Sequence, residues 1–201
     1  MGRRNEHSRE ELRELALQAA IQIINEQGLS GLSTRKIATA IGYTVGSLYL
    51  VFKNLDDLVL QINARTLDEL YTVINRTARQ HEPPEQCLLA LGHTYFQFVM
   101  DQPQRWRMLF EYHRSQRTPL PSWYQKKIAR LFNLVEKPLQ KILRAPHIQA
   151  CVKDARALWG SVHGICILAD KLEVVGVHSI PQLLELLITT YLAGLKEREQ
   201  K

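Results

Sequence analysis

The side chains best suited to chemistry, cysteine and histidine, are scattered along this chain of 201 residues. Cys87, Cys151 and Cys166 form no Cys-x-x-Cys pair, and the seven histidines show no ligand spacing, so we expect buried thiols and no metal site. His163 and Cys166 stand three residues apart and could touch on a helix, but a nucleophilic thiol also needs a group that orients its base. With no glycine-rich phosphate loop and no nucleophile elbow either, the sequence predicts neither an enzyme nor a cofactor.

A different chemistry is indicated by residues 33–53, which read STRKIATAIGYTVGSLYLVFK. Apolar residues at helical spacing give this segment an inner face, and Gly42 permits a sharp turn between two short helices. That arrangement is typical of a helix-turn-helix, whose second helix lies in the major groove of DNA. The apolar positions are Ile37, Ala38, Ile41, Leu48 and Phe52.

The side chains left outside this motif suit the sugar-phosphate backbone and the base edges. Thr34 and Arg35 stand at a helix N-terminus, which favours a phosphate, and Tyr49 and Lys53 reach phosphates on the other flank. The second helix has no Arg, Lys, Asn or Gln, which excludes the common bidentate contacts to guanine and adenine. Part of the specificity is therefore assigned either to DNA shape or to Arg35, Lys36 and the arm Arg3-Arg4. The remaining predicted contacts are Thr44, Val45 and Ser47 to base edges, Gly46 for close approach, and Lys36, Arg3 and Arg4.

The same segment resembles the TetR/AcrR family of transcriptional regulators over roughly residues 10–60. The resemblance implies a homodimeric regulator, usually a repressor, that binds a near-palindromic operator in double-stranded DNA and responds to a small molecule. The sequence departs from the family pattern at Leu55, which replaces a frequent lysine, and at Leu50 and Val51, which replace frequent aromatic or histidine residues. The matching residues are Thr34, Ile37, Ala38, Gly42, Gly46, Leu48, Tyr49, Phe52 and Leu58, preceded by a helix that ends in Gly28-Leu29.

Residues 95–111 and 158–169 resemble the TetR subgroup named after a Trp…His-Gly motif, carried here by Trp159, His163 and Gly164. This resemblance implies a helical C-terminal domain that dimerises through its last two long helices. Trp159 and His163 lie one turn apart on a helix. They either line a pocket for an unknown effector or belong to the core, with the histidine satisfied by a hydrogen bond and Gly164 allowing close helix packing. The same two alternatives apply to Phe96, Trp106 and Phe110.

Helix-start and helix-stop residues predict an all-α fold of about nine helices. We assign residues 1–56 to a DNA-binding domain and residues 57–201 to an effector-binding and dimerisation domain, with the boundary inside a continuous fourth helix. The third helix is expected to reach about Val51, and Pro138 should kink or interrupt a later one. The start signals are Ser8 with Glu11, Ser33, Thr44, Asn54, Pro84, Pro103, Pro146 and Ser179, and Gly28 is a stop.

The final helix has a broad apolar face, which should pack against something large, and we predict the same helix of a second subunit. This face consists of Leu183, Leu184, Leu187, Ile188, Tyr191, Leu192 and Leu195.

Positive charge is concentrated away from the helix-turn-helix. The chain carries a net charge of +6, yet residues 1–53 hold seven Lys/Arg against five Asp/Glu, and residues 100–156 hold twelve against four. The basic residues of that second segment either attract an anionic effector or partner or form a solvated helix face. A fold that has lost DNA binding and serves as an interaction protein is a further alternative. Without a membrane-length apolar stretch or a signal peptide, a cytoplasmic protein that does not enter the membrane is expected.

Overall fold

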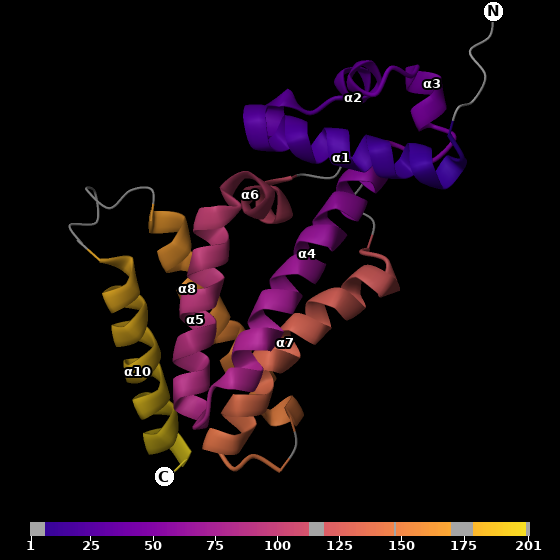
Figure 1. Ribbon diagram of the computed structural model, residues 1–201. Coiled ribbons are helices and arrows are strands. Elements are labelled where there is room, and N and C mark those ends of the chain that lie inside the picture. Colours follow the sequence, from indigo (N-terminus) through magenta and orange to yellow (C-terminus); the bar gives the residue numbers. More distant parts are fainter. Residues whose placement is uncertain (1–6, 113–118, 147, 170–178, 200–201) are drawn as a thin grey trace, which may run out of the picture. The chain divides into compact units, whose positions relative to one another are not determined.

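The computed structural model describes residues 7–112, 119–146, 148–169 and 179–199, and all regular structure in these ranges is helical (Figure 1). This confirms the predicted all-α class. None of the described helices combines the length and the apolar character that crossing a membrane requires. The described α-helices are α1 (Arg9–Gln27), α2 (Thr34–Ala40), α3 (Val45–Leu48), α4 (Leu55–Gln80), α5 (Pro84–Asp101), α6 (Pro103–Glu111), α7 (Ser122–Ile142), α8 (Val152–Leu168) and α10 (Ile180–Glu199), with short 3-10 turns η1 (Leu29–Gly31) and η2 (Ile148–Cys151).

The chain divides into two compact units. Unit 1 consists of Met1–Thr66 and Gln102–Leu120, and unit 2 of Leu67–Asp101 and Pro121–Lys201. Unit 1 therefore holds α1, α2, α3, the first part of α4, and α6. The division by packing lies inside α4, ten residues after the predicted functional boundary between residues 56 and 57. That functional boundary stays a prediction, because compactness does not report which residues bind DNA.

Several helix ends lie where local sequence signals place them. The Ser8 hydroxyl accepts a hydrogen bond from the Glu11 N–H at 3.2 Å, and the Glu11 carboxylate accepts one from the Ser8 N–H at 2.6 Å, which completes the predicted capping box. Gly28 ends α1 at φ 69° and Gly42 follows α2 at φ 72°, a backbone region that favours glycine. Asn54 accepts from the Asp57 N–H at 2.8 Å and starts α4.

Other helix ends differ from the prediction. α3 ends at Leu48, and the chain then continues with shorter-range bonds, such as that from the Val51 N–H to the Leu48 carbonyl at 3.0 Å. α7 runs on through Pro138, so the predicted interruption is absent. Pro138 is buried, and the packing of α7 against α5 and α8 offsets the hydrogen bond that a proline cannot donate. The helix expected to open at Pro146 begins as α8 at Val152.

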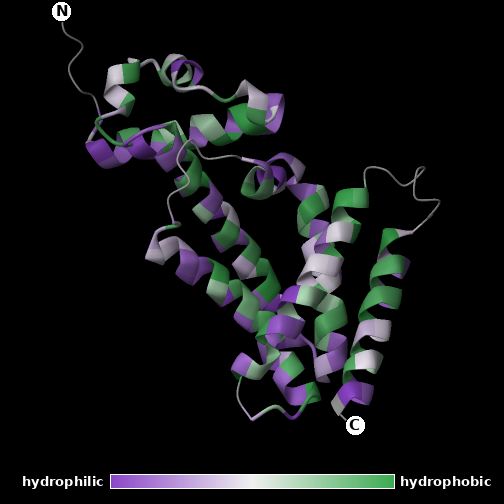
Figure 2. Ribbon diagram, turned by 180° about the vertical axis from the view of Figure 1, so that it is seen from behind, coloured by the Kyte–Doolittle hydropathy of each residue, from purple (hydrophilic) through white to green (hydrophobic). Residues whose placement is uncertain are grey.

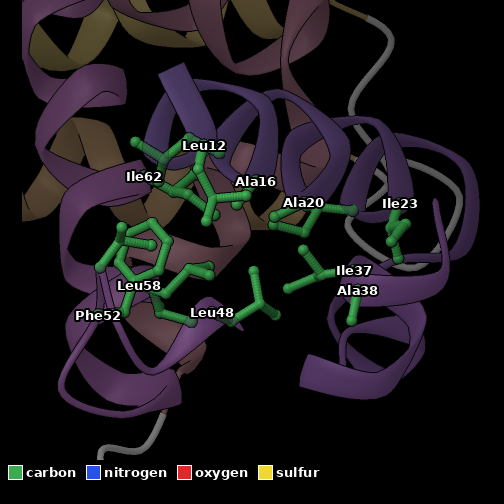
Figure 3. Close-up of a cluster of buried hydrophobic side chains, with 14 of the residues drawn as sticks. Leu12, Ala16, Ala20, Ile23, Ile37, Ala38, Leu48, Phe52, Leu58 and Ile62 are labelled. Atoms are coloured by element: carbon green, nitrogen blue, oxygen red, sulfur yellow. The ribbon is translucent and has the colours of Figure 1, made fainter. Parts of the chain in front are cut away.

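A single apolar core holds unit 1 together, and Figure 3 shows part of it. One face of α1 meets the inner faces of α2, α3 and α4, and Met108 of α6 joins the same core. Ile37, Leu48 and Phe52 are at most 3% exposed, which confirms that they form the inner face of the helix-turn-helix. Each such burial contributes about 1.5–3 kcal/mol to stability. The core therefore fixes the positions of α2 and α3.

In unit 2, α10 packs against α5 and α8. Leu184 and Ile188 of α10 are at most 1% exposed, and a Cβ on Gly92 of α5 would lie 2.5 Å from the Ile188 Cδ1. The apolar face of α10 that we expected to meet a second subunit is therefore largely covered by the chain's own helices. Apolar groups that do reach the surface lie elsewhere on these helices, at Met100, Ile167, Leu168 and Leu186.

Two ion pairs near the end of α10 differ in burial and predict different mutational effects. The Arg198 guanidinium donates to both carboxylate oxygens of Asp154, at 3.0 and 2.9 Å, and Asp154 is buried. Lys196 donates to Glu85 at 2.7 Å, but both of these side chains are well exposed. Because Arg198→Ala leaves a buried carboxylate without this partner, we expect it to lower the free energy of unfolding by about 2 kcal/mol.

The matched change on the same helix turn is Lys196→Ala, which should cost less than about 1 kcal/mol because exposed ion pairs are weak. Urea unfolding of the two variants measures the difference. Equal losses would contradict the account of Asp154 as a buried charge that depends on Arg198.

Candidate nucleic-acid interface

The turn between α2 and α3 is held by local hydrogen bonds as well as by the core beneath it. Ser33 caps α2 by accepting from the Lys36 N–H at 3.2 Å. The Tyr43 N–H donates to the Ala38 carbonyl at 2.9 Å, which fixes the turn after Gly42. Thr44 caps α3 by accepting from the Ser47 N–H at 3.2 Å. The residues that face away from the core are therefore presented by a rigid backbone.

Two of the predicted base contacts are bonded to each other. The Thr44 and Ser47 hydroxyl oxygens lie 2.9 Å apart, and either of them can be the donor. Each hydroxyl has one O–H to donate, so one of the two is used inside the pair and the other remains for an outside acceptor. Thr44 and Ser47 thus act as one unit with a single free donor, next to the threonine methyl group.

Along α3, the other predicted contacts differ in exposure. Tyr49 is 52% exposed, whereas Val45 is half-buried and packs against the unit 1 core. A Cβ on Gly46 would lie 3.6 Å from the Thr44 Oγ1, an ordinary contact, so packing within the chain does not require glycine there. The predicted role of Gly46 in close approach to DNA stays consistent with this open position.

The predicted cationic contacts lie in different surroundings. Arg35 and Lys53 are exposed, and the Lys53 N–H donates to the Asp57 carboxylate at 3.0 Å, which fixes its backbone. Lys36 instead donates to the Gln27 Oε1 at 2.7 Å and so points toward α1. Thr34 opens α2 and is half-buried. Arg3 and Arg4 lie outside the described residues.

The three residues that depart from the family pattern differ in how deeply they are buried. Val51 is buried in the unit 1 core, and Leu55 at the start of α4 is half-buried against it. Leu50 is 59% exposed beside Tyr49. Two of the three substitutions therefore serve packing, and Leu50 places an apolar group on the outer surface.

One pair of residues at this surface was missed by the sequence analysis. The His7 Nδ1 lies 2.8 Å from the Tyr43 hydroxyl, with ring centroids 6.1 Å apart. His7 directly precedes the capping Ser8, and Tyr43 directly precedes the capping Thr44. Both positions could have been noted from the sequence, but their contact joins segments 36 residues apart, which no local pattern reveals.

The predicted effector contacts divide between the two units. Trp106 and Phe110 lie on α6 in unit 1, with ring centroids 5.5 Å apart. In unit 2 the Trp159 ring stacks on His163 at 4.9 Å, and the His163 Nδ1 lies 2.9 Å from a hydroxyl that the sequence analysis did not include, that of Tyr95. The remaining predicted contact, on α5 in unit 2, is the half-buried Phe96.

Neither the predicted packing role of Gly164 nor a nucleophilic Cys166 agrees with the structure. A Cβ on Gly164 would meet nothing within 4 Å in the described part of the chain. Burial raises the pKa of the Cys166 thiol to about 12 and lowers the pKa of His163. The thiol is therefore protonated at neutral pH, a state without nucleophilic character. Among the described residues, no group of three His, Cys, Asp or Glu side chains is placed to hold a metal ion.

Thiol labelling tests this account of the cysteines. Cys87, Cys151 and Cys166 are all buried, and burial also raises the pKa of Cys87. At pH 8 we expect iodoacetamide to modify Cys166 roughly a thousandfold more slowly in the folded protein than in urea, because the thiolate is the reactive form. The rate should stay low as the pH rises toward 9, since a raised pKa preserves the thiol. Rapid labelling of Cys166 in the folded protein would contradict its burial.

Two family models match the chain. Residues 16–62 match the model described as bacterial regulatory proteins, tetR family. Residues 88–191, about half of the chain, match the model described as tetracyclin repressor-like, C-terminal domain. A curated relative, the tetracycline repressor protein class D of Escherichia coli, is 42% identical over 60 residues, which make up 28% of this chain and 28% of the relative. The chain thus spans just over a quarter of the length of that relative.

Solved structures show the same fold. A protein of unknown function from Rhodococcus sp. RHA1 superposes with a TM-score of 0.74 at 18% identity, covering 97% of this chain and 100% of that one. The transcriptional regulator FadR from Bacillus subtilis, solved in complex with stearoyl-CoA, gives a TM-score of 0.63 at 14% identity, covering 90% and 98%. With the helix-turn-helix in place and half of the chain matching a single family model, this chain belongs to the TetR family of bacterial regulatory proteins.

Proposed function

We propose that this chain is a transcriptional repressor that binds a near-palindromic operator in double-stranded DNA as a homodimer and is controlled by a small-molecule effector. The observation that carries the proposal is the position of α3, whose inner face is locked into the unit 1 core while Tyr49 and the Thr44–Ser47 pair face outward. Residues 1–56 are the proposed DNA-binding domain, and residues 57–201 the proposed effector and dimerisation domain.

In the proposed complex, one set of side chains binds the DNA phosphates and a second set of small side chains contacts the base edges. Thr34, Arg35, Tyr49 and Lys53 hold the backbone on both sides of the groove. The single free donor of the Thr44–Ser47 pair contacts an acceptor on a base edge, and the threonine methyl suits a thymine methyl. Because one subunit makes few such contacts, useful affinity requires two α3 helices in successive major grooves, about 34–36 Å apart.

The proposed dimer uses α8 and α10, on a different face from the one expected. On α10, Leu186 is 62% exposed, and on α8, Ile167 is 50% exposed. Gly160 of α8 is exposed too, and a Cβ at this position would meet nothing within 4 Å in the described part of the chain. Figure 2 shows how apolar α10 is over most of its length. Exposed apolar groups and an open glycine position on α8 and α10 favour contact with the same helices of a second subunit.

Unit 2 is the proposed site of effector binding. Tyr95 and His163 pair next to the Trp159 ring, so an organic molecule with an apolar part and one hydrogen-bonding group fits the chemistry of these side chains. The bound stearoyl-CoA belongs to the FadR neighbour, and for this chain we propose the general class alone. The effector needs to favour one conformation by about 1–3 kcal/mol to control DNA binding.

A gel-shift series with fragments of the source genome tests the proposed function. At moderate salt, a fragment containing the operator should bind at least roughly a thousandfold more tightly than bulk DNA. If every fragment binds no better than bulk DNA, the proposal fails. An interaction protein would then be favoured, in agreement with the absence of charged side chains from α3.

A further inference from the structure

The pair formed by His7 and Tyr43 lies at the leading end of α3. Tyr43 directly precedes Thr44, the residue that caps α3, and its hydroxyl lies 2.8 Å from the His7 Nδ1. His7 itself is exposed, and its backbone is fixed because the next residue, Ser8, is held in the capping box of α1. Two polar groups from distant segments thus meet beside the helix that we propose enters the major groove.

We propose that His7 and Tyr43 together bind the phosphate backbone of DNA at the edge of that groove. The inference rests on the proposed function and adds a phosphate contact to it. When the imidazole carries its second proton, Nδ1–H donates to the tyrosine oxygen, so the tyrosine O–H is released to donate elsewhere. The imidazole Nε2–H is then a second donor. These two donors point in different directions, so each donates to a separate phosphate oxygen along the strand, and the positive charge strengthens the contact.

The charged groups around His7 leave these donors available. Glu11 on α1 is the acid that interacts with His7 electrostatically, but its carboxylate is engaged by Ser8. Hydrogen bonds from the Ser8 backbone and side chain lower the pKa of Glu11, and the charge of His7 contributes least. On the other side, Tyr43 is the titratable group from the α2–α3 turn. A phosphate therefore does not have to displace Glu11 from its role in the capping box.

This geometry links the contact to the charge of the imidazole. Added salt screens that charge, so the contribution of the contact to DNA affinity should fall as the salt concentration rises. In the neutral pair the positive charge and one of the two donors are lost, because either the imidazole Nε2–H or the tyrosine O–H remains available. A purely structural link between α1 and the turn has no reason to change DNA affinity in this way.

The test uses the full chain and a mixed-sequence 30-base-pair DNA duplex, because a phosphate contact does not depend on base sequence. At pH 6 and low salt, His7→Gln and Tyr43→Phe should each weaken binding about tenfold, the loss of one charge-assisted hydrogen bond. At high salt the loss caused by His7→Gln should become smaller, because screening weakens the charged part of the contact. The slope of log affinity against log salt at pH 6 should fall by roughly 1 per subunit in His7→Gln.

The matched control is His81→Gln in unit 2, where the imidazole Nδ1 bonds to the Thr77 carbonyl at 2.9 Å. It should leave the affinity and its salt dependence unchanged. Melting temperatures of all variants check that the fold is retained. If the chain binds the duplex and both His7→Gln and Tyr43→Phe keep its affinity at pH 6, the phosphate site is rejected while the proposed function stands. If the unmodified chain binds no duplex at all, the proposed function fails and this inference fails with it.

Discussion

Replacing Leu186 with glutamate is expected to convert the protein from a dimer to a monomer and to weaken operator binding by more than about a hundredfold. Leu186 is 62% exposed on α10, so the change should disturb the folding of a single chain little. In the proposed dimer the new carboxylate is buried, and the two-fold axis places it twice in one interface. An unpaired buried charge costs several kcal/mol, enough to lower the dimerisation constant at least about a thousandfold.

Sedimentation equilibrium measures the dimerisation, and gel shift measures the operator affinity. Leu186→Met, which preserves volume and apolar character, should remain a dimer. Ala129→Glu adds the same charge to an exposed position of α7 and should also remain dimeric. A Leu186→Glu protein that stays a dimer would place the interface on another surface and would reject the proposed use of α8 and α10.

The combined change of Tyr49 and Lys53 to alanine is expected to remove operator binding while the dimer persists. Tyr49 is 52% exposed at the end of α3, and Lys53 is exposed just before α4. Each subunit loses two phosphate contacts, so a dimer loses four. At about 1 kcal/mol each, the loss is about 4 kcal/mol, or roughly a thousandfold in affinity.

A single substitution separates this effect from the loss of positive charge alone. Lys126→Ala removes an exposed lysine of α7 in unit 2. It should change operator affinity by less than about threefold. If Tyr49 and Lys53 can be replaced without a loss of binding, α3 and its flank do not face the DNA, and the interaction-protein alternative gains support.

Local signals predicted most of the helices. The capping box at Ser8, the stop at Gly28 and the cap at Asn54 each depend on a few neighbouring residues, and the structure contains all three. The same holds for α5, which begins at Pro84 after the break that follows α4. Inner-face residues such as Ile37 were predictable because helical spacing alone decides which residues share a face.

The remainder depends on contacts between distant segments. Spacing identified an apolar face on α10, but not its partner, and α5 and α8 cover it. The sequence analysis named Thr44 and Ser47 as separate contacts to base edges, whereas the folded chain places their hydroxyl oxygens 2.9 Å apart. Val45 was placed among the outward residues, yet it is half-buried against the unit 1 core. The His7–Tyr43 contact required the fold to bring together residues 36 positions apart.

The central claim, that two α3 helices of a dimer read operator DNA, is tested most directly by selecting bound duplexes from a random library and sequencing them. The account predicts enrichment of a near-palindrome whose half-site centres lie about 10–10.5 base pairs, or one helical turn, apart. It also predicts only a modest preference for particular bases within each half-site, because α3 has no charged side chain that could contact a base. Selected sequences without two-fold symmetry, or a library that shows no enrichment over its starting composition, would contradict it.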